Sequence, residues 1–280
     1  MQLYHWPRGT DFRWLGLISV DPAAQQELVT QLAELRRNGY QQSGLEPALV
    51  PPDVDTAYEI AAMVADELGW EVVGWKIAAT NKKMQAALRT DAPIYGRVFS
   101  GHVKSAPITV AHAPLCNPIP EVEYQVRLGA DLPPCAQPYT RAQVEAATAA
   151  ISIGIELAEC RFIHDDNFPA LPAILADGAG SGTLILGPEI KDWRNQDITN
   201  QEVVLSVDGV ECRRGRAENT VEHPIVPLTW LANRLSRSGI GMKAGQVIST
   251  GTLTGMLRPK PGETYRADFG PFGDVTMTLT

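Results

Sequence analysis

The segment IPEVEYQVRLGADL, residues 119–132, has the alternation of polar and apolar residues that is typical of a β-strand. Successive side chains of a strand point to opposite faces, so this segment has one apolar and one polar face. The apolar face consists of Val122, Tyr124, Val126 and Leu128. The polar face carries two glutamates, Glu121 and Glu123, followed by Gln125 and Arg127. An isolated pair of glutamates at this spacing is most often solvated, so the pair alone does not indicate a function.

A second alternating segment, ISIGIEL at residues 151–157, supplies a third carboxylate. Its polar face consists of Ser152, Gly154 and Glu156, and the small residues leave room beside the glutamate. If this face lies next to Glu121 and Glu123, the three carboxylates repel one another unless their pKa values rise or a cation binds. Carboxylates without His or Cys partners favour Mg²⁺ or Mn²⁺ and leave about three octahedral positions open. The pattern therefore raises the hypothesis of a catalytic metal site.

Composition restricts the class of protein. The 280 residues are 44% hydrophobic and 20% charged, which is enough to bury a sizeable core. A net charge of −8 argues against binding to nucleic acid or to a membrane surface. The four cysteines lack a C-x-x-C spacing and no apolar run approaches the length of a membrane span. We therefore expect a cytoplasmic protein that binds a small molecule.

The order of the segments predicts an α+β fold. Helical patterns at residues 22–39 and 54–68 predict a small helical N-terminal part, residues 1–70. The remainder, residues 71–280, contains short β-prone runs separated by Gly and Pro, which predicts a β-rich catalytic domain. Two further helices are expected within it, at residues 141–150 and 227–239.

Several other residues are candidates for a binding site. Lys76 lies in the apolar run VVGWKIAAT, where it either extends to solvent from the strand end or lines a pocket. The glycine-rich segment LADGAGSGTLILG, residues 175–187, contains Asp177 and Ser181 and is either a ligand-binding loop or a flexible turn. The segment at residues 249–263 either presents Thr250 or Thr252 to an anion or forms a long hairpin. We discount His164 as a ligand, because the two consecutive aspartates that follow it indicate a loop that faces solvent.

Taken in order, these segments resemble the 2-keto-4-pentenoate hydratase group of the fumarylacetoacetate hydrolase superfamily. The resemblance covers residues 54–280 and depends on GWKIAATNKKMQAALRTDAPIYGRV, PEVEYQVRLGADL, GIELAECRF, LADGAGSGTLILG, GRAENTVEHPIVPLTWLANRLSRSG and GQVISTGTLTGM. It implies a mixed β-roll, a homo-oligomer, and Mg²⁺ or Mn²⁺ bound by Glu121, Glu123 and Glu156. Lys76 and Asp177 are the implied catalytic residues. Candidate substrate-binding residues are Asp91, Arg161, Ser181 and Thr250.

The chain departs from the pattern of that group in the loop at residues 177–180. It reads Asp-Gly-Ala-Gly where members of the group typically read Asp-Asn-Ala-Ser, and Ile94 replaces a more polar residue. The first 20 residues match no part of the pattern. These departures keep open a non-catalytic, ligand-binding role.

The resemblance implies chemistry on a 2-oxo or 2-hydroxydienoic acid. The first hypothesis is hydration of a 2-hydroxy-2,4-dienoate to a 4-hydroxy-2-oxo acid, a hydro-lyase reaction. The alternative is decarboxylation of a 2-oxo-3-enedioate of the 4-oxalocrotonate type. Such a substrate has a second carboxylate, which favours a positively charged side chain at the far end of the pocket. Candidates for that side chain are Arg89, Arg97 and Arg161. Hydrolysis of a C–C bond ranks third because no His/Glu pair for activating water is evident.

Overall fold

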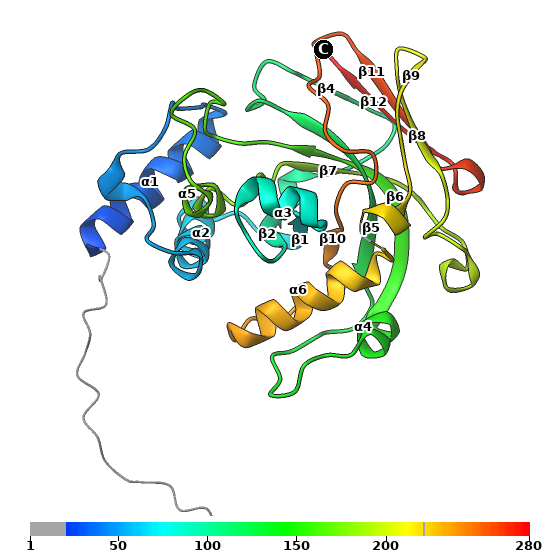
Figure 1. Cartoon of the computed structure of the whole chain (residues 1–280), viewed down its shortest axis with the longest axis horizontal. Helices are drawn as coiled ribbons and strands as arrows, with labels where there is room; N and C mark the ends of the chain where they lie inside the picture. The colour runs from blue at the N-terminus through cyan, green and yellow to red at the C-terminus, as the bar shows by residue number, and fades with distance from the viewer. Residues whose placement is uncertain (1–20, 221) are drawn as a thin grey trace, which may run out of the picture.

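A computed structural model describes residues 21–220 and 222–280, and its strands form two sheets (Figure 1). The first sheet has seven strands in the order β2-β1-β10-β5-β6-β7-β3, and the second has five in the order β4-β12-β11-β8-β9. The strands of the first sheet are β1 Val72–Ala78, β2 Ile94–Phe99, β3 Val103–Ser105, β5 Ile119–Leu128, β6 Thr148–Ala158, β7 Thr183–Glu189 and β10 Val247–Ser249. Those of the second are β4 Ile108–Val110, β8 Val203–Val207, β9 Val210–Gly215, β11 Thr264–Asp268 and β12 Asp274–Leu279.

The N-terminal part is helical, as predicted. It contains α1 Pro22–Asn38 and α2 Val54–Leu68, which pack against each other at one end of the molecule (Figure 1). The side chain of Asp53 caps α2 by accepting a hydrogen bond from the backbone N–H of Thr56 at 2.8 Å. Gly39 and Gly69 end the two helices in the left-handed conformation that glycine adopts without strain. The predicted helices at residues 22–39 and 54–68 are confirmed.

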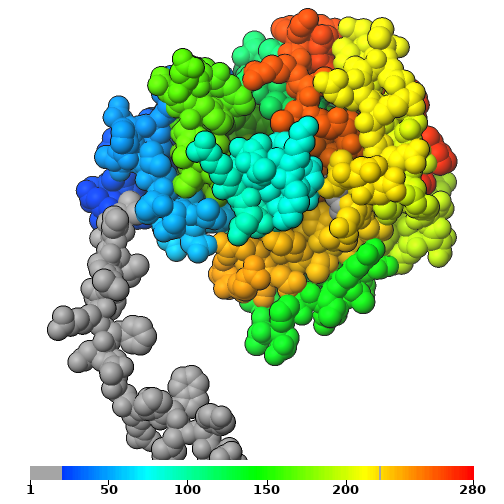
Figure 2. Space-filling view, in the orientation of Figure 1, coloured from blue at the N-terminus to red at the C-terminus, as the bar shows by residue number. Residues whose placement is uncertain are grey.

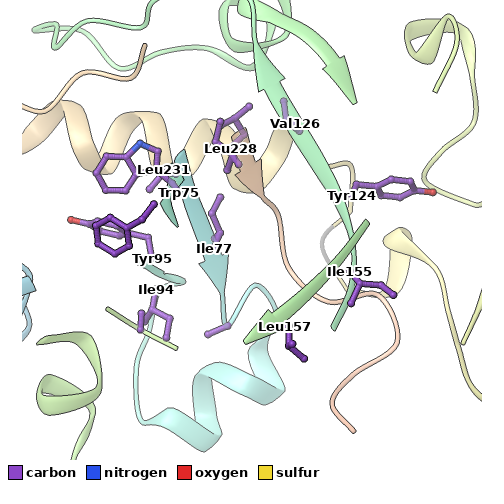
Figure 3. Packing of buried hydrophobic residues seen from close by; sticks show 14 of the residues in the cluster. Trp75, Ile77, Ile94, Tyr95, Tyr124, Val126, Ile155, Leu157, Leu228 and Leu231 are labelled. Carbon is purple, nitrogen blue, oxygen red and sulfur yellow. The ribbon is translucent and has the colours of Figure 1, made fainter. Parts of the chain in front are cut away.

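The core lies on the apolar face of the seven-stranded sheet. Figure 3 shows Leu228 and Leu231 of α6, Ile225–Arg237, beside Trp75 and Val126. Tyr124 points away from this group, and its ring lies 5.5 Å from that of Phe269, next to the second sheet. Helix α6 and the second sheet therefore cover the same apolar face, and the alternation in β5 correctly predicted it.

Several local predictions were wrong. Helix α4, Arg141–Ala147, ends three residues before the expected Ala150, and β6 begins at once with Thr148. The segment at residues 249–263 is not a hairpin, because β10 and β11 belong to different sheets. Two short helices were not predicted, α3 Lys82–Leu88 and α5 Leu171–Ala176. The α3 segment (cyan) lies between the N-terminal helices and the second sheet on the face in Figure 2.

Residues 1–20, which matched no part of the family pattern, lie outside the described part of the chain. Among the residues that the structure describes, no helix has both the length and the apolar character needed to cross a membrane.

Candidate metal centre

The polar faces of β5 and β6 bring three glutamates together. The two strands are antiparallel neighbours, and their register places Glu121 opposite Glu156 and Glu123 opposite Gly154. One carboxylate oxygen of each glutamate lies within 4.8 Å of the others. The exposed fractions are 9% for Glu121, 1% for Glu123 and 0% for Glu156. The solvated alternative for this face is therefore wrong, and the predicted convergence is confirmed.

The electrostatics of this cluster favour a bound cation. Burial raises the pKa of Glu121 to about 7, and the charge of Glu156 adds to the rise while Lys76 opposes it. Burial, followed by the charges of Glu156 and Glu121, raises the pKa of Glu123 well above its ordinary value. Within residues 21–220 and 222–280, neither carboxylate oxygen of Glu156 has a hydrogen-bond partner, although buried acceptors normally have one. A hard divalent cation would satisfy these oxygens, so the donor set fits Mg²⁺ or a similar ion.

Glu123 is held in place by the segment that follows β10. Its Oε2 accepts hydrogen bonds from the hydroxyl of Ser249 and, at 2.8 Å, from the backbone N–H of Gly251. Both donors bind the same oxygen of the carboxylate, and no described residue donates to the other oxygen. Glu123 is therefore oriented before any ion binds.

Lys76 joins the cluster from β1. Its ammonium nitrogen lies 3.8 Å from Oε1 of Glu156, and only 3% of the residue is exposed. The alternative in which Lys76 extends to solvent is therefore wrong. A buried ammonium group beside a carboxylate can stabilise negative charge or move a proton within the site.

The loop that follows α5, residues 177–182, lies over the polar face of the sheet. Gly96 of β2 allows this approach, because a Cβ atom there would lie 2.0 Å from the carbonyl oxygen of Gly178. A Cβ atom on Gly180 would lie 3.4 Å from the ammonium nitrogen of Lys76. The buried hydroxyl of Ser181 donates to the carbonyl of Arg97. The glycine-rich segment thus forms a wall of the site beside Lys76.

Two buried arginines hold the loop in this position. The carboxylate of Asp177 accepts hydrogen bonds from Nε of Arg161 at 2.7 Å and from the backbone N–H of Arg161 at 3.0 Å. Arg36 of α1 donates to the carbonyl oxygens of Asp177 and Ser181. Burial and the charge of Arg161 lower the pKa of Arg36 to about 10, which still leaves it charged at neutral pH. The N-terminal helical part therefore contributes directly to the geometry of the site.

Arg36 also borders two surface clefts. One has a volume of about 310 Å³ and extends to Glu159 and Thr183. The other lies between α2 and the loop, next to Tyr58 and Gly178. The three glutamates border neither of these two clefts of the described chain and are nearly fully buried.

Replacing Arg36 by Met should lower the free energy of unfolding by about 2 kcal/mol, because the change removes one of the two charged donors to the buried carbonyl oxygens of Asp177 and Ser181, which Arg161 also bonds. The exposed neighbour Arg37, which lies 3.8 Å from Glu67, provides the matched control, Arg37→Met. A surface ion pair of this kind should cost less than about 1 kcal/mol. Urea denaturation of both variants measures the difference. Equal losses would contradict the anchoring role of Arg36.

The other candidate residues lie elsewhere. Asp91 is exposed in the segment between α3 and β2. The hydroxyl of Thr250 is buried and donates to the carbonyl of Tyr124 at 2.7 Å, and that of Thr252 donates to Gly255. His164 packs against Phe168 at a ring distance of 4.4 Å. None of these side chains belongs to the cluster of described glutamates, and roles for Asp91 and Thr250 stay predictions.

The sequence did not indicate every residue of the site. Ser249 and Gly251 contact Glu123, but the pattern of their segment indicated only Thr250 and Thr252 as candidates. Arg36 had no sequence signal at all, because it lies 141 positions from Asp177 in a helix of ordinary composition. Gln125 was on the correct face but was not considered as a functional residue.

Comparisons with known proteins identify the family of the chain. A family model described as fumarylacetoacetate (FAA) hydrolase C-terminal matches residues 77–280. A 2-keto-4-pentenoate hydratase of Burkholderia vietnamiensis is 30% identical over 256 residues, 90% of this chain and 96% of that protein. A 2-hydroxyhexa-2,4-dienoate hydratase of Comamonas testosteroni is 28% identical over 81% of this chain and 86% of its own.

The solved structures give the same fold. The 4-oxalocrotonate decarboxylase from Pseudomonas putida G7, complexed with magnesium and adipate, superposes with a TM-score of 0.86 at 21% identity. The match covers 94% of this chain and 99% of the decarboxylase. The same enzyme has also been solved with calcium and acetate. Because the family model covers most of the chain and the hydratase match spans nearly its whole length, the chain belongs to the fumarylacetoacetate hydrolase family.

Proposed function

We propose that this protein is a metal-dependent lyase that adds water to a 2-hydroxy-2,4-dienoate and releases a 4-hydroxy-2-oxo acid. The observation that carries the proposal is the buried cluster of three glutamates, with both oxygens of Glu156 unpartnered and Lys76 3.8 Å away. The names of the hydratase relatives support the same reaction class. The magnesium bound to the decarboxylase supports the choice of ion, and we extend it to Mn²⁺ on the chemistry of the donors.

In this proposal Glu121, Glu123 and Glu156 would hold the divalent cation, beside which the C1 carboxylate and C2 oxygen of the substrate would bind. When bound, the cation supplies Lewis-acid stabilisation of negative charge at that C2 oxygen. Ser249 and Gly251 keep Glu123 oriented throughout, because their hydrogen bonds do not depend on the substrate.

Lys76 has the proposed role of moving protons between the substrate and the site. Hydration of 2-hydroxypenta-2,4-dienoate requires loss of the enol proton and protonation at C5, which gives a conjugated 2-oxo-3-enoate. Water then adds at C4, with a proton delivered at C3, to give 4-hydroxy-2-oxopentanoate. A buried ammonium group 3.8 Å from Glu156 can exchange protons with the substrate while its charge favours the enolate.

Asp177 is better explained as a positioning residue than as a proton carrier. Its two carboxylate oxygens accept hydrogen bonds from the side chain and backbone of Arg161. We propose that this pairing keeps the loop at residues 177–182 against Lys76, where it excludes water from the reacting end of the substrate. Ser181, in the same loop, stays a proposed substrate contact, which would require its hydroxyl to leave the carbonyl of Arg97.

Decarboxylation of a 2-oxo-3-enedioate is the second candidate, because it needs the same stabilisation of charge at C2. The arginines considered for a distal carboxylate do not favour it. Arg161 is paired with Asp177, Arg97 lies over the ring of Trp75 at 5.3 Å, and Arg89 is exposed at the end of α3. We therefore place hydration first.

A substrate panel tests this choice. Purified protein with Mg²⁺ or Mn²⁺ would be mixed with 2-hydroxypenta-2,4-dienoate, its 6-carbon homologue and 2-oxohex-3-enedioate. Loss of dienol absorbance with formation of the 4-hydroxy-2-oxo acid supports the hydratase. Release of CO₂ from the enedioate alone supports the decarboxylase. Unchanged spectra for all three substrates would favour a ligand-binding protein without catalysis.

The stability of the metal-free protein should fall as the pH rises from about 5 to 8. A glutamate whose pKa is raised in the fold is stabilising while protonated, and this contribution is lost as the pH passes the folded value, about 7 for Glu121. The shift for that one group corresponds to about 3 kcal/mol. Mg²⁺ binds the ionised carboxylates, so its stabilising effect should increase over the same range.

Thermal unfolding in EDTA and in saturating Mg²⁺ at pH 5, 6.5 and 8 measures both trends, with NaCl at equal ionic strength as the control. If Mg²⁺ raises the unfolding temperature as much at pH 5 as at pH 8, ionised carboxylates are ruled out as the binding groups.

The resemblance also implies a homo-oligomer, and we retain this as part of the proposal. Analytical ultracentrifugation of the full chain distinguishes an oligomer from a monomer of 30.4 kDa.

A further inference from the structure

Gln125 lies in the row of side chains next to the glutamates on the polar face of the sheet. Across the strands, Lys76 pairs with Ser249, Ser249 with Gln125, and Gln125 with Ser152. Gln125 is 1% exposed and lies two positions after Glu123 on the same face of β5. Its strand, β5, therefore lies between β1, which carries Lys76, and β6, which carries Glu156. The side chains of Lys76 and Glu156 approach each other above the sheet.

The side chain of Gln125 lies over Gly154. A Cβ atom built on Gly154 would lie 2.4 Å from both Cδ and Oε1 of Gln125, so the glycine is required for this conformation. Gly154 is the residue opposite Glu123 and lies two positions before Glu156. The amide group therefore lies at the position opposite Glu123, next to the facing pair Glu121 and Glu156.

The amide of Gln125 has an unpartnered oxygen. Its Nε2 makes one long contact, 3.5 Å to the carbonyl of Ile155, and its Oε1 has no hydrogen-bond partner. The two oxygens of Glu156 are buried and unpartnered as well. These three buried acceptor oxygens require donors or a cation, because a buried acceptor without a partner is destabilising. Water bound to a cation at the glutamates would supply donors to Oε1.

We propose that Gln125 supplies a fourth oxygen to the metal centre. Its side chain would act through a water molecule bound to the ion. Its Oε1 accepts a hydrogen bond from that water, and its neutral amide adds no charge to the three carboxylates. Groups that hold the ligands of a metal in this way typically contribute 10–100-fold to metal affinity. This inference depends on the proposed metal centre and adds a residue to it.

The test measures the dissociation constant of Mn²⁺ by electron paramagnetic resonance, without substrate. Gln125→Leu, which keeps the volume but removes the acceptor, should weaken binding 10–100-fold. Gln125→Glu, which keeps an acceptor oxygen, should bind at least as tightly as the wild type. The control is Gln85→Leu, because Gln85, in α3, is also buried, but its amide donates to the carbonyl oxygen of Ala79, just after β1 and outside the cluster. That variant should bind Mn²⁺ normally.

A double substitution tests the geometry. Gly154→Ala should displace the amide and weaken Mn²⁺ binding as much as Gln125→Leu does. In a Gln125→Ala background, the same Gly154→Ala change should have no further effect, because the space is then free. Additive losses would contradict the contact between the two residues, and circular dichroism in EDTA confirms that each variant is folded.

The outcomes separate this inference from the proposed function. If the wild type binds Mn²⁺ and hydrates the dienoate while Gln125→Leu binds Mn²⁺ equally well, only the role of Gln125 is overturned. If the wild type binds no Mn²⁺, the metal centre and the role of Gln125 are overturned together.

Discussion

The Glu156→Gln variant should lose metal-dependent turnover, with kcat/KM lower by roughly 1000-fold, or about 4 kcal/mol of transition-state stabilisation. Among the described residues, neither oxygen of Glu156 has a hydrogen-bond partner, and its nearest counter-charge is Lys76 at 3.8 Å, so both oxygens are available to the ion and the substitution removes one ligand charge. Mn²⁺ binding should weaken in parallel. Steady-state kinetics on the dienoate and Mn²⁺ titration measure the two effects.

The same substitution should stabilise the metal-free protein. When all four groups are charged, above the raised pKa values of the glutamates, the three glutamates and Lys76 carry a net charge of −2, and Glu156→Gln reduces it to −1. The variant should therefore unfold at a higher temperature than the wild type in EDTA. Mg²⁺ should raise its unfolding temperature only slightly. Glu159→Gln, three residues further along the chain, is the matched control because its carboxylate accepts a hydrogen bond from Cys116 outside the cluster. Normal turnover by Glu156→Gln would show that the ligand assignment is wrong.

The Lys76→Met variant should lower kcat by about 10²- to 10⁴-fold, the usual contribution of a group that transfers protons in the transition state. Its Mn²⁺ affinity should stay equal or increase, because the positive charge 3.8 Å from Glu156 is removed. Loss of turnover with retained metal binding separates a catalytic role from a structural one. Kinetics and Mn²⁺ titration of the same preparation provide both values.

The control for Lys76 is Lys104→Met, since Lys104 is an exposed residue of β3 at the other edge of the sheet. It should retain wild-type kcat. If Lys76→Met keeps more than about a tenth of the wild-type kcat, its proton-transfer role is refuted.

The sequence pattern predicted the face of the glutamates and raised their convergence only as a hypothesis. Alternation in residues 119–132 and 151–157 assigned the polar and apolar faces correctly. The convergence depends on the register between β5 and β6, which pairs Glu121 with Glu156. A shift of one residue would turn one set of side chains to the other face, and no local pattern in either strand specifies that register. The resemblance to a known family, rather than periodicity, made the prediction definite.

The parts of the site that were missed depend on distant contacts or on short elements. The anchoring of the loop by Arg36 joins the first helix to a segment more than half the chain away. Helix α3 has seven residues and α5 has six, too few for a hydrophobic period to be recognised. The packing of Gln125 over Gly154 follows from the pairing of the strands and the absence of a Cβ atom, and neither residue alone indicates it.

The central claim is that acidic side chains from β5 and β6 hold one divalent cation. A crystal structure of the protein soaked with Mn²⁺ and a non-reactive 2-oxo acid, with anomalous diffraction, tests it most directly. The account predicts one anomalous peak within about 2.5 Å of oxygens from Glu121, Glu123 and Glu156, with the acid bound through two oxygens. A peak at another place, or no peak at these glutamates under saturating Mn²⁺, would contradict it.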